Sequence, residues 1–478
     1  MPYEFERTHR LAVLGGGPGG YEAALAGAQL GADVTLVERA GVGGSAVLTD
    51  VVPSKTLIAT AEAANAVREA ADLGVQFYTH SDKGRVVRPE VAVNLGAVNK
   101  RLLALAQQQS ADMKASLVRS GVRILQGDGR LDGPNTIVVS TGRGKSRTDF
   151  DEVTADTLVI AVGASPRILP TAKPDGERIF TWTQLYSLEA IPEHLIVVGS
   201  GVTGAEFASA YLALGSAVTL VSSRDQVLPG EDDDAAAVIQ AVFKRNGMTV
   251  LNKSRAASVT RDGDGVIVTL ADGREVKGSH ALLAVGSIPN TAGIGLEEAG
   301  IQLTESGHIR VNRVARTSMP SVYAAGDCSD FLPLASVAAM QGRTAVFHAM
   351  GDAVTPTEQR NVTSNIFTQP EVATVGWSQH QIEEGVAQGE IYKLELASNP
   401  RAKMMGLKDG FVKIFARTGS GTVIGGVVVA PKASDLILPI ALAVEHRLTV
   451  DQLARAFSVY PSLSGTITDA ARAMHIVG

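Results

Sequence analysis

Cysteine is almost absent from this 478-residue chain, which contains only Cys328. A single cysteine cannot form an intramolecular disulfide or a zinc site made of several thiolates, and we expect Cys328 to be a small buried side chain. The chain also lacks the run of about 18 apolar residues that a membrane-spanning helix needs. Its first ten residues, MPYEFERTHR, show no apolar signal-peptide core. We therefore expect a cytoplasmic protein with no membrane span and no metal centre.

Length and charge narrow the class further. The net charge of −6 is small, which argues against nucleic acid as the main partner. A hydrophobic content of 45% with 19% charged residues is typical of a soluble globular protein. The chain is too long for a single core, so about three domains are expected.

A partial repeat is present in the chain. Residues 9–40, HRLAVLGGGPGGYEAALAGAQLGADVTLVERA, have the pattern of a strand, a glycine turn, a helix and a second strand. Residues 193–224, EHLIVVGSGVTGAEFASAYLALGSAVTLVSSR, have the same pattern. This order is typical of a dinucleotide-binding unit. The repeat predicts two such domains, the second inserted in the first or following it.

The first unit has the residues that an unphosphorylated dinucleotide such as FAD requires. Gly15 permits the tight turn, Gly17 lets the backbone approach a pyrophosphate, and Gly20 allows the helix to pack closely on the strand. The pyrophosphate would meet the amides at the helix N-terminus. Glu38, at the end of the second strand, can accept a hydrogen bond from a ribose hydroxyl.

The second unit, with Gly199, Gly201 and Gly204, lacks the acid at the end of its second strand. Ser222, Ser223 and Arg224 stand there instead. A carboxylate would repel a 2′-phosphate, whereas hydroxyls and a guanidinium would hold one. The second site therefore favours NADPH, with NADH still possible. The alternative, that Arg224 is only a solvated loop charge, stays open.

Three further segments are apolar strands that run into glycine turns: residues 157–170, 280–290 and 321–330. The last ends in Gly326-Asp327, and an aspartate at such a strand end could bind a ribityl hydroxyl. The run GEDDDAAAV (230–238) is more typical of a helix N-cap with acids in the first turn than of an ion site. Two dinucleotide sites on one chain indicate electron transfer from one cofactor to the other.

In this order the motifs resemble the flavoprotein disulfide reductase family, which includes lipoamide dehydrogenase, glutathione reductase and mercuric reductase. The matching pieces are the fingerprint at 15–20 with Glu38, the GG…PSK segment at 43–55, the VGAS turn at 162–165, the fingerprint at 199–206, Gly326-Asp327 and YPSLSG at 460–465. Together they cover nearly the whole chain. The branch that this sequence most resembles is the actinobacterial lipoamide-dehydrogenase-like NAD(P)H:quinone reductases.

The resemblance implies an α/β, glutathione-reductase-like fold with two Rossmann-type dinucleotide-binding domains and an α+β C-terminal dimerisation domain. The implied domains are an FAD-binding domain in two parts (1–165 and 287–354), an NAD(P)-binding domain (166–286) and a dimerisation domain (355–478), and hence a homodimer. From its sequence, the C-terminal part is expected to contain paired strands at 410–417 and 422–431 and one helix over 433–448. The resemblance implies these cofactor-binding residues: Gly15, Gly17, Pro18, Gly20, Glu38, Arg39, Gly43, Gly44, Ser45, Lys55, Gly129, Ala161, Val162, Gly163, Gly326, Asp327, Leu334 and Ala335 for FAD, and Gly199, Gly201, Val202, Thr203, Gly204, Glu206, Ser222, Ser223, Arg224 and Gly286 for NAD(P)H.

The departures from the family pattern concern its chemistry. Family members that reduce disulfides carry two cysteines just before PSK, where this chain has Ala46 and Val51. Tyr460 aligns with the family's acid–base histidine, and Gly465 aligns with its supporting glutamate. Without a thiolate there is no mixed disulfide, and without the histidine there is no proton relay for thiols. Disulfide reduction is therefore excluded, while hydride transfer to a flavin requires neither group.

We expect electrons to pass from the flavin directly to a flat acceptor such as a quinone, on a small apolar surface made of Ala46, Val47, Val51 and Val52. The resemblance pairs Lys55 with Glu206 beside the flavin and the nicotinamide. Lys55 would stabilise negative charge there and Glu206 would position it, unless the pair only locks two domains together.

The resemblance implies a dimer in which Tyr460 lies in the partner subunit's active site. There its hydroxyl either donates a hydrogen bond to a quinone oxygen or its side chain only fills space. Two other functions stay open. The first is a reductase for a protein partner such as a ferredoxin, although no basic docking cluster is present. The second is a non-catalytic FAD-binding subunit, against which the two intact fingerprints argue.

Overall fold

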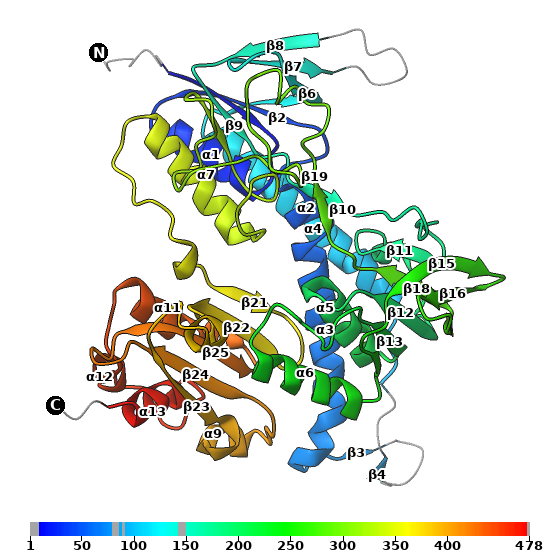
Figure 1. Ribbon diagram of the computed structural model, residues 1–478. Coiled ribbons are helices and arrows are strands. Elements are labelled where there is room, and N and C mark those ends of the chain that lie inside the picture. Colours follow the sequence, from blue (N-terminus) through cyan, green and yellow to red (C-terminus); the bar gives the residue numbers. More distant parts are fainter. Residues whose placement is uncertain (1–8, 79–85, 88–90, 142–149, 476–478) are drawn as a thin grey trace. The chain divides into compact units, whose positions relative to one another are not determined.

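A computed structural model describes residues 9–78, 86–87, 91–141 and 150–475 (Figure 1). The chain divides into two compact units, each built from three segments of the sequence. Unit 1 contains residues 1–54, 100–167 and 286–359, and unit 2 contains residues 55–99, 168–285 and 360–478. Residues 1–8 of the polar N-terminal segment lie outside the described residues. In the part of the chain that is described, no helix has the length and apolar character needed to cross a membrane.

Unit 1 is centred on a five-stranded parallel sheet. Its strands are, in spatial order, β20 (Val322–Ala324), β9 (Thr157–Ile160), β1 (Arg10–Leu14), β2 (Asp33–Glu38) and β5 (Arg123–Gln126). An antiparallel sheet of β6 (Asp128–Leu131), β7 (Thr136–Ser140) and β8 (Phe150–Thr154) follows β5 in the chain, and a short ribbon joins β10 (Ala164–Pro166) to β19 (Ser287–Pro289). The strand–helix–strand pattern predicted for residues 9–40 is confirmed.

The helices of unit 1 pack through small residues. Helix α1 (Pro18–Gln29) lies against α7 (Ala335–Ala349), as Figure 1 shows. A Cβ at Gly342 would lie 2.0 Å from the carbonyl oxygen of Gly19, so the two helices touch at their backbones. Two helices follow β2: the short α2 (Gly44–Leu48) lies in unit 1, and the longer α3 (Val51–Glu69) begins there and continues into unit 2. The long helix α4 (Leu95–Arg119) likewise contributes to both units.

Unit 2 contains a second five-stranded parallel sheet with the topology predicted for residues 193–224. Its strands are, in spatial order, β11 (Ile179–Thr181), β18 (His280–Leu283), β12 (His194–Val198), β13 (Ala217–Val221) and β14 (Thr249–Leu251). The helices α5 (Val202–Leu214) and α6 (Asp233–Arg245) follow β12 and β13. An antiparallel sheet of β15 (Ala256–Asp262), β16 (Gly265–Leu270) and β17 (Glu275–Gly278) follows β14.

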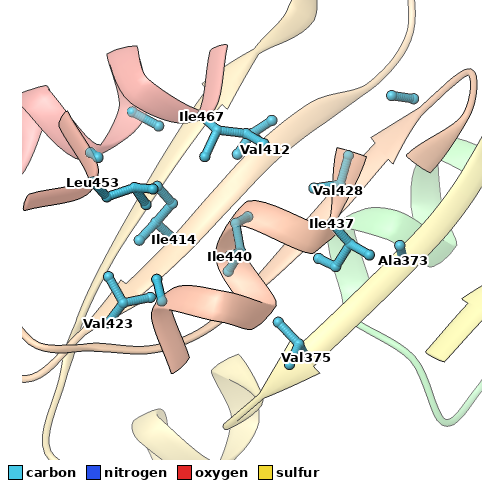
Figure 2. Packing of buried hydrophobic residues seen from close by; sticks show 14 of the residues in the cluster. Ala373, Val375, Val412, Ile414, Val423, Val428, Ile437, Ile440, Leu453 and Ile467 are labelled. Atoms are coloured by element: carbon cyan, nitrogen blue, oxygen red, sulfur yellow. The ribbon is translucent and has the colours of Figure 1, made fainter. Parts of the chain in front are cut away.

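The C-terminal part of unit 2 is an antiparallel sheet in the order β21 (Ser364–Ile366), β22 (Glu371–Gly376), β25 (Val423–Ala430), β24 (Phe411–Ala416) and β23 (Glu390–Glu395). The pairing of β24 with β25 confirms the strands predicted there. One sheet face packs against helices in a core that includes Val412, Ile414, Val428, Ile440 and Ile467 (Figure 2). The helices of this part are α8 (Gln379–Glu383), α9 (Pro400–Met404), α10 (Ala433–Leu436), α11 (Leu438–Glu445), α12 (Val450–Ala454) and α13 (Gly465–Ala473).

The single helix predicted over residues 433–448 is wrong. The structure has α10 and α11 there, with a break at Ile437. Pro439 is the second residue of α11, and a proline has no N–H to donate to the preceding turn. Proline is tolerated only in the first turn of a helix, so the chain starts a new helix around it.

Candidate active site

The carboxyl ends of the unit 1 strands bring most of the residues predicted to bind FAD to one sheet edge. Gly15 follows β1, Glu38 ends β2, Ala161 follows β9, and Gly326 and Asp327 follow β20. In open parallel sheets, ligands bind outside this edge. Gly129 lies instead on β6, where a Cβ would meet Leu14 at 2.5 Å.

The first glycine turn has the conformation that its sequence predicts. Gly15 has a φ of +99°, and a Cβ there would lie 2.4 Å from the carbonyl oxygen of Ala161. A Cβ at Gly20 would lie 1.8 Å from the carbonyl oxygen of Gly15, so no side chain fits at either position. Gly17, the N-cap of α1, has open space on its Cβ side apart from that same Ala161 oxygen at 4.0 Å. Such an open, amide-lined turn at a helix N-terminus fits the pyrophosphate of FAD.

Glu38 organises the loops around this turn. Its carboxylate accepts hydrogen bonds from the amides of Gly16 and Ala40, both at 2.6 Å, and from that of Gly41 at 3.1 Å. Gly43 then donates to the carbonyl oxygen of Gly16 at 2.7 Å, which brings the GG segment against the fingerprint. Each carboxylate oxygen can accept more than one hydrogen bond, so a ribose hydroxyl fits here too.

Asp327 provides a second polar group at the same edge. It is half-buried, and this burial raises the pKa of its carboxyl group. Among the described residues, no hydrogen bond is made to this carboxylate. Gln341 on α7 fixes the preceding residue, since its Oε1 accepts from the Gly326 amide at 2.8 Å. A half-buried carboxylate with no hydrogen-bond partner among the described residues fits a ribityl hydroxyl.

The remaining residues predicted for FAD lie around this edge. Leu334 is the N-cap of α7 and Ala335 is its first residue. Val162 and Gly163 continue from Ala161, and Arg39 and Ser45 are exposed. Pro18 opens α1. Gln341 was missed, because a glutamine within a helix gives no sequence signal for a role at the preceding strand end.

The second glycine turn, in unit 2, repeats the geometry of the first. Gly199 has a φ of +111°, and a Cβ there would lie 2.1 Å from the carbonyl oxygen of Ala284. A Cβ at Gly204 would lie 1.9 Å from the carbonyl oxygen of Gly199. At Gly201, the N-cap of α5, an added Cβ would have no described atom within 4 Å. Val202 and Thr203 form the first turn of α5, and Gly286 follows β18 and Val285 in the chain.

Ser222 does not have the exposure that a 2′-phosphate ligand needs. Its side chain is fully buried, and its Oγ lies 2.7 Å from the Oγ of Ser200 and accepts from the Arg224 amide at 3.1 Å. Ser222 is therefore a loop-building residue, which corrects the prediction that its hydroxyl contacts the phosphate; the same prediction for Ser223 stays a prediction. Ser223 and Arg224 are both exposed at the end of β13.

The Lys55–Glu206 pair predicted from the resemblance is present within unit 2. Lys55 Nζ lies 2.8 Å from Glu206 Oε2. The other carboxylate oxygen, Oε1, accepts from the amide of Phe367 at 2.9 Å, and the Phe367 ring centroid lies 4.9 Å from the ammonium. Glu206 is 4% exposed, whereas the Lys55 side chain keeps 28% of its surface accessible. The Glu206 carboxylate is thus fixed, while the Lys55 ammonium can still face a ligand. The contact of this pair with Phe367 was not predicted, because no sequence pattern indicated it.

The segment that replaces the redox cysteines lies at the junction of α2 and α3. Ala46 is on α2 and half-buried, and Val51 begins α3 with 36% of its surface exposed. Val52 is half-buried. Val47 must be removed from the predicted apolar surface, because its side chain is buried against Gly43.

Tyr460 lies on the surface of the part of the chain that the structure describes. It lies between α12 and α13 with 82% of its surface exposed, beside the exposed Val459. Asn399 holds the following turn, since its amide donates to the carbonyl oxygen of Ser462 at 3.0 Å and to Thr466 Oγ1 at 2.9 Å. Cys328, as expected, is fully buried, and burial raises the pKa of its thiol to about 11.

Comparison with known proteins supports this arrangement. Residues 9–342 match the model of the pyridine nucleotide-disulphide oxidoreductase family, and residues 362–471 match its dimerisation domain. A Mycobacterium tuberculosis protein named NAD(P)H dehydrogenase (quinone) is 51% identical over 469 residues, which cover 97% of this chain and 93% of that protein. The dihydrolipoyl dehydrogenase of Zymomonas mobilis is 32% identical, with 95% of each chain covered.

Solved structures agree with the fold. The crystal structure of LpdA from Mycobacterium tuberculosis superposes with a TM-score of 0.91 at 50% identity, covering 98% of this chain and all of that one. The flavoprotein disulfide reductase RclA from Escherichia coli shares the fold alone, with a TM-score of 0.83 at 20% identity. The chain belongs to the pyridine nucleotide-disulphide oxidoreductase family of FAD- and NAD(P)H-dependent enzymes.

Proposed function

We propose that this protein is an FAD-dependent NAD(P)H:quinone oxidoreductase without disulfide reductase activity. The observation that carries the proposal is the combination of two well-formed nucleotide turns with a sulfur-free α2–α3 junction. Ala46 and Val51 occupy the redox positions, and neither has a group that can form a mixed disulfide. The relative that is 51% identical is named for quinone reduction, which supports the same acceptor class.

FAD, when bound, supplies the isoalloxazine ring that takes a hydride from NAD(P)H and delivers two electrons to an acceptor. The residues of the chain orient the two cofactors and stabilise the charge that develops on them. In our proposal the Lys55 ammonium, held at 2.8 Å by Glu206, stabilises the negative charge that develops during hydride transfer. Glu206 keeps the ammonium in place because its second oxygen is bound by the Phe367 amide.

We further propose that the accessible methyl groups of Ala46, Val51 and Val52 form the contact surface for a flat, apolar acceptor. The acceptor's oxygens then require a donor. Tyr460 is our candidate, because its exposed phenol, on the part of the chain that matches the dimerisation domain, is free to meet a ligand.

For the nucleotide, we propose a preference for NADPH over NADH that rests on Arg224. With Ser222 buried, the exposed Ser223 and the guanidinium of Arg224 are the groups available to a 2′-phosphate. A charge-assisted phosphate contact is strong enough to discriminate between the two cofactors.

The Lys55→Met variant tests the proposed role of the ion pair. Anaerobic stopped-flow mixing with NADPH should show flavin bleaching that is slower by about a hundredfold, the typical effect of removing one electrostatic stabiliser. Lys432→Met is the matched control, because Lys432 likewise pairs with a single glutamate, Glu62 of α3 at 3.0 Å, but is exposed. An unchanged bleaching rate in Lys55→Met would reduce the pair to a structural lock.

Tyr460→Phe tests the proposed donor separately. If the hydroxyl donates to the quinone, turnover with the acceptor should fall about ten- to a hundredfold while flavin bleaching by NADPH is unchanged. Unaltered quinone turnover would make Tyr460 a space-filling residue.

A further inference from the structure

Lys413, on β24 in the dimerisation domain, is a completely buried cation. Its side chain is 1% exposed. The ammonium donates to both carboxylate oxygens of Asp232 at 2.8 Å and to Gln379 Oε1 at 2.6 Å, and it lies 2.7 Å from Asp234 Oδ2. A buried charge persists only when its partners are close and well placed. This site meets that condition with three acceptor side chains.

The alternation of side chains along β24 explains the direction in which Lys413 points. Val412, Ile414 and Ala416 face the apolar core shown in Figure 2. Phe411 and Lys413 are out of phase with these residues, so they lie on the opposite face of the strand. That face meets the N-terminus of α6, which bears Asp232 and Asp234.

A second lysine makes this arrangement dependent on the acids. Lys393 on β23 lies directly opposite Lys413 in the antiparallel register. Two like charges at opposite positions of a sheet destabilise it. Here the acids compensate, because Asp234 lies 3.5 Å from Lys393 Nζ as well as 2.7 Å from Lys413 Nζ. The two lysines therefore form a pair of hydrogen-bond donors for the acids of α6.

Asp232 links this site to the nucleotide-binding loop. It is the N-cap of α6, accepting from the Ala235 amide at 3.1 Å, and it ends the loop of residues 222–232 that begins after β13. The same loop is fixed at its other end to the second glycine turn. Ser222 bonds to Ser200, and the Leu228 amide donates to the carbonyl oxygen of Ser200 at 2.8 Å.

The middle of the loop carries Arg224 and shows one costly backbone conformation. Leu228 has a φ of +54°, in the left-handed region that non-glycine residues rarely adopt. Such a conformation persists when the surroundings over-determine it. On one side the Leu228 amide is bonded to Ser200 and the Arg224 carbonyl oxygen accepts from the Lys253 amide at 2.8 Å; on the other side Asp232 is bonded to Lys413.

We infer that Lys413 is a positioning residue for the NAD(P)H site: from the dimerisation domain, it fixes the loop that presents Arg224 to the adenosine end of the nucleotide. The inference rests on the proposed function only in that this loop binds the 2′-phosphate end of NADPH. It adds a requirement that the fingerprint of residues 199–206 does not contain. Residues far along the chain, in the C-terminal sheet, determine the shape of the nucleotide site.

The test measures binding of 2′,5′-ADP, which carries the adenosine end of NADPH and no nicotinamide, to the FAD-loaded enzyme by calorimetry. The double variant Lys413→Met/Asp232→Asn loses the ion pair between these two residues. It buries no unpaired charge, and asparagine can still cap α6. The affinity should fall about three- to thirtyfold, the range expected for residues that act through a neighbouring element. Hydrogen exchange in residues 222–232 should become faster in the same variant, and KM for NADPH should rise while kcat is unchanged.

Two further variants keep the result decisive. Asp232→Asn alone leaves Lys413 with Asp234 and Gln379, so it folds, and it should weaken 2′,5′-ADP binding in the same direction by about threefold. Ile440→Val, in the core on the opposite sheet face, is the control for general loss of stability in the domain and should leave the affinity unchanged. Unchanged affinity in both Lys413→Met/Asp232→Asn and Asp232→Asn would overturn the inference, as would an equal loss in Ile440→Val. Failure of the wild-type enzyme to reduce quinones would refute the proposed function and leave these binding results intact.

Discussion

At the scale of single residues, Ser222 and Arg224 show how adjacent positions take different roles. Both are polar and follow the same strand, so the sequence treats them alike. Ser222 points inward and bonds to Ser200, whereas Arg224 is exposed and its amide donates to the Ser222 hydroxyl. The buried serine builds the loop that presents the exposed arginine.

Substitutions of Ser222 and of Arg224 should therefore have different effects on the kinetics with NADPH and NADH. Arg224→Ala should lower kcat/KM for NADPH about ten- to a hundredfold and spare NADH, because a charge-assisted contact is lost. Ser222→Ala should also lower kcat/KM for NADPH, but by less than Arg224→Ala does, since it loosens the loop that presents Arg224 without removing the guanidinium. Steady-state kinetics with both nucleotides measure this. Equal losses for NADPH and NADH in Arg224→Ala would show that the guanidinium does not read the phosphate.

His280, at the start of β18, gives the protein a pH-dependent stability. It is buried, stacks on Phe180, lies 2.9 Å from an Arg178 nitrogen, and its pKa is lowered to about 4, chiefly by burial. Below about pH 6.5 the unfolded chain binds a proton at this histidine and the folded chain does not. The free energy of unfolding should therefore fall by about 1–3 kcal/mol as the pH drops from 6.5 toward 4.

Thermal unfolding at several pH values checks this effect. His280→Gln should flatten the dependence of Tm on pH between 6.5 and 4. His380→Gln is the control, because His380 is exposed on α8 and should leave the dependence as it is in the wild type. A wild-type Tm that does not change over this pH range would contradict the role assigned to His280.

At the scale of helices and strands, the sequence predicts those features that depend on the residue types within one short segment. The two strand–turn–helix–strand units follow from glycines that no side chain can replace, such as Gly15 and Gly199. The break between α10 and α11 could have been read from Pro439. The roles of Lys413 and Phe367 could not, because each depends on which distant element packs against its strand.

Asn399 is the element-scale anchor of the Tyr460 turn. It caps α9 through the amides of Arg401 and Ala402 and donates to the 462–466 segment. Asn399→Ala should reduce the free energy of unfolding by about 1–3 kcal/mol, because a cap is lost and the buried Thr466 hydroxyl loses its donor. Asn246→Ala, at an exposed position, should change it by less than about 0.5 kcal/mol. Chemical denaturation measures both, and equal effects would remove the special role of Asn399.

Two cysteines can be introduced at the α2–α3 junction, at the positions where disulfide-reducing family members carry them. Ala46→Cys with Val51→Cys should allow a disulfide to form and intercept electrons, so quinone turnover should fall. Lipoamide turnover should stay negligible, since position 460 is a tyrosine and position 465 a glycine, and neither can act as the family's histidine or glutamate. Acceptor assays on the double variant measure both activities. Robust lipoamide reduction would refute the reasoning from the missing groups.

At the scale of the whole molecule, the two units repeat one design. Each places a glycine turn and most of the residues predicted to bind a cofactor at the carboxyl edge of a five-stranded parallel sheet. The family and the fold were predictable because motifs from residue 15 to residue 465 occur in one order. The domain boundaries remain a prediction. The physiological acceptor is not encoded in any motif, because an apolar contact surface binds by shape rather than by a fixed set of polar groups.

The central claim is that electrons leave the flavin directly for a quinone-type acceptor. The most direct measurement is anaerobic stopped-flow mixing of enzyme, first bleached with one equivalent of NADPH, against either a soluble quinone or oxidised lipoamide. We predict that flavin absorbance returns with the quinone and stays bleached with lipoamide, because the chain has no dithiol to carry electrons to a disulfide. Recovery of the absorbance with lipoamide and not with the quinone would contradict the account.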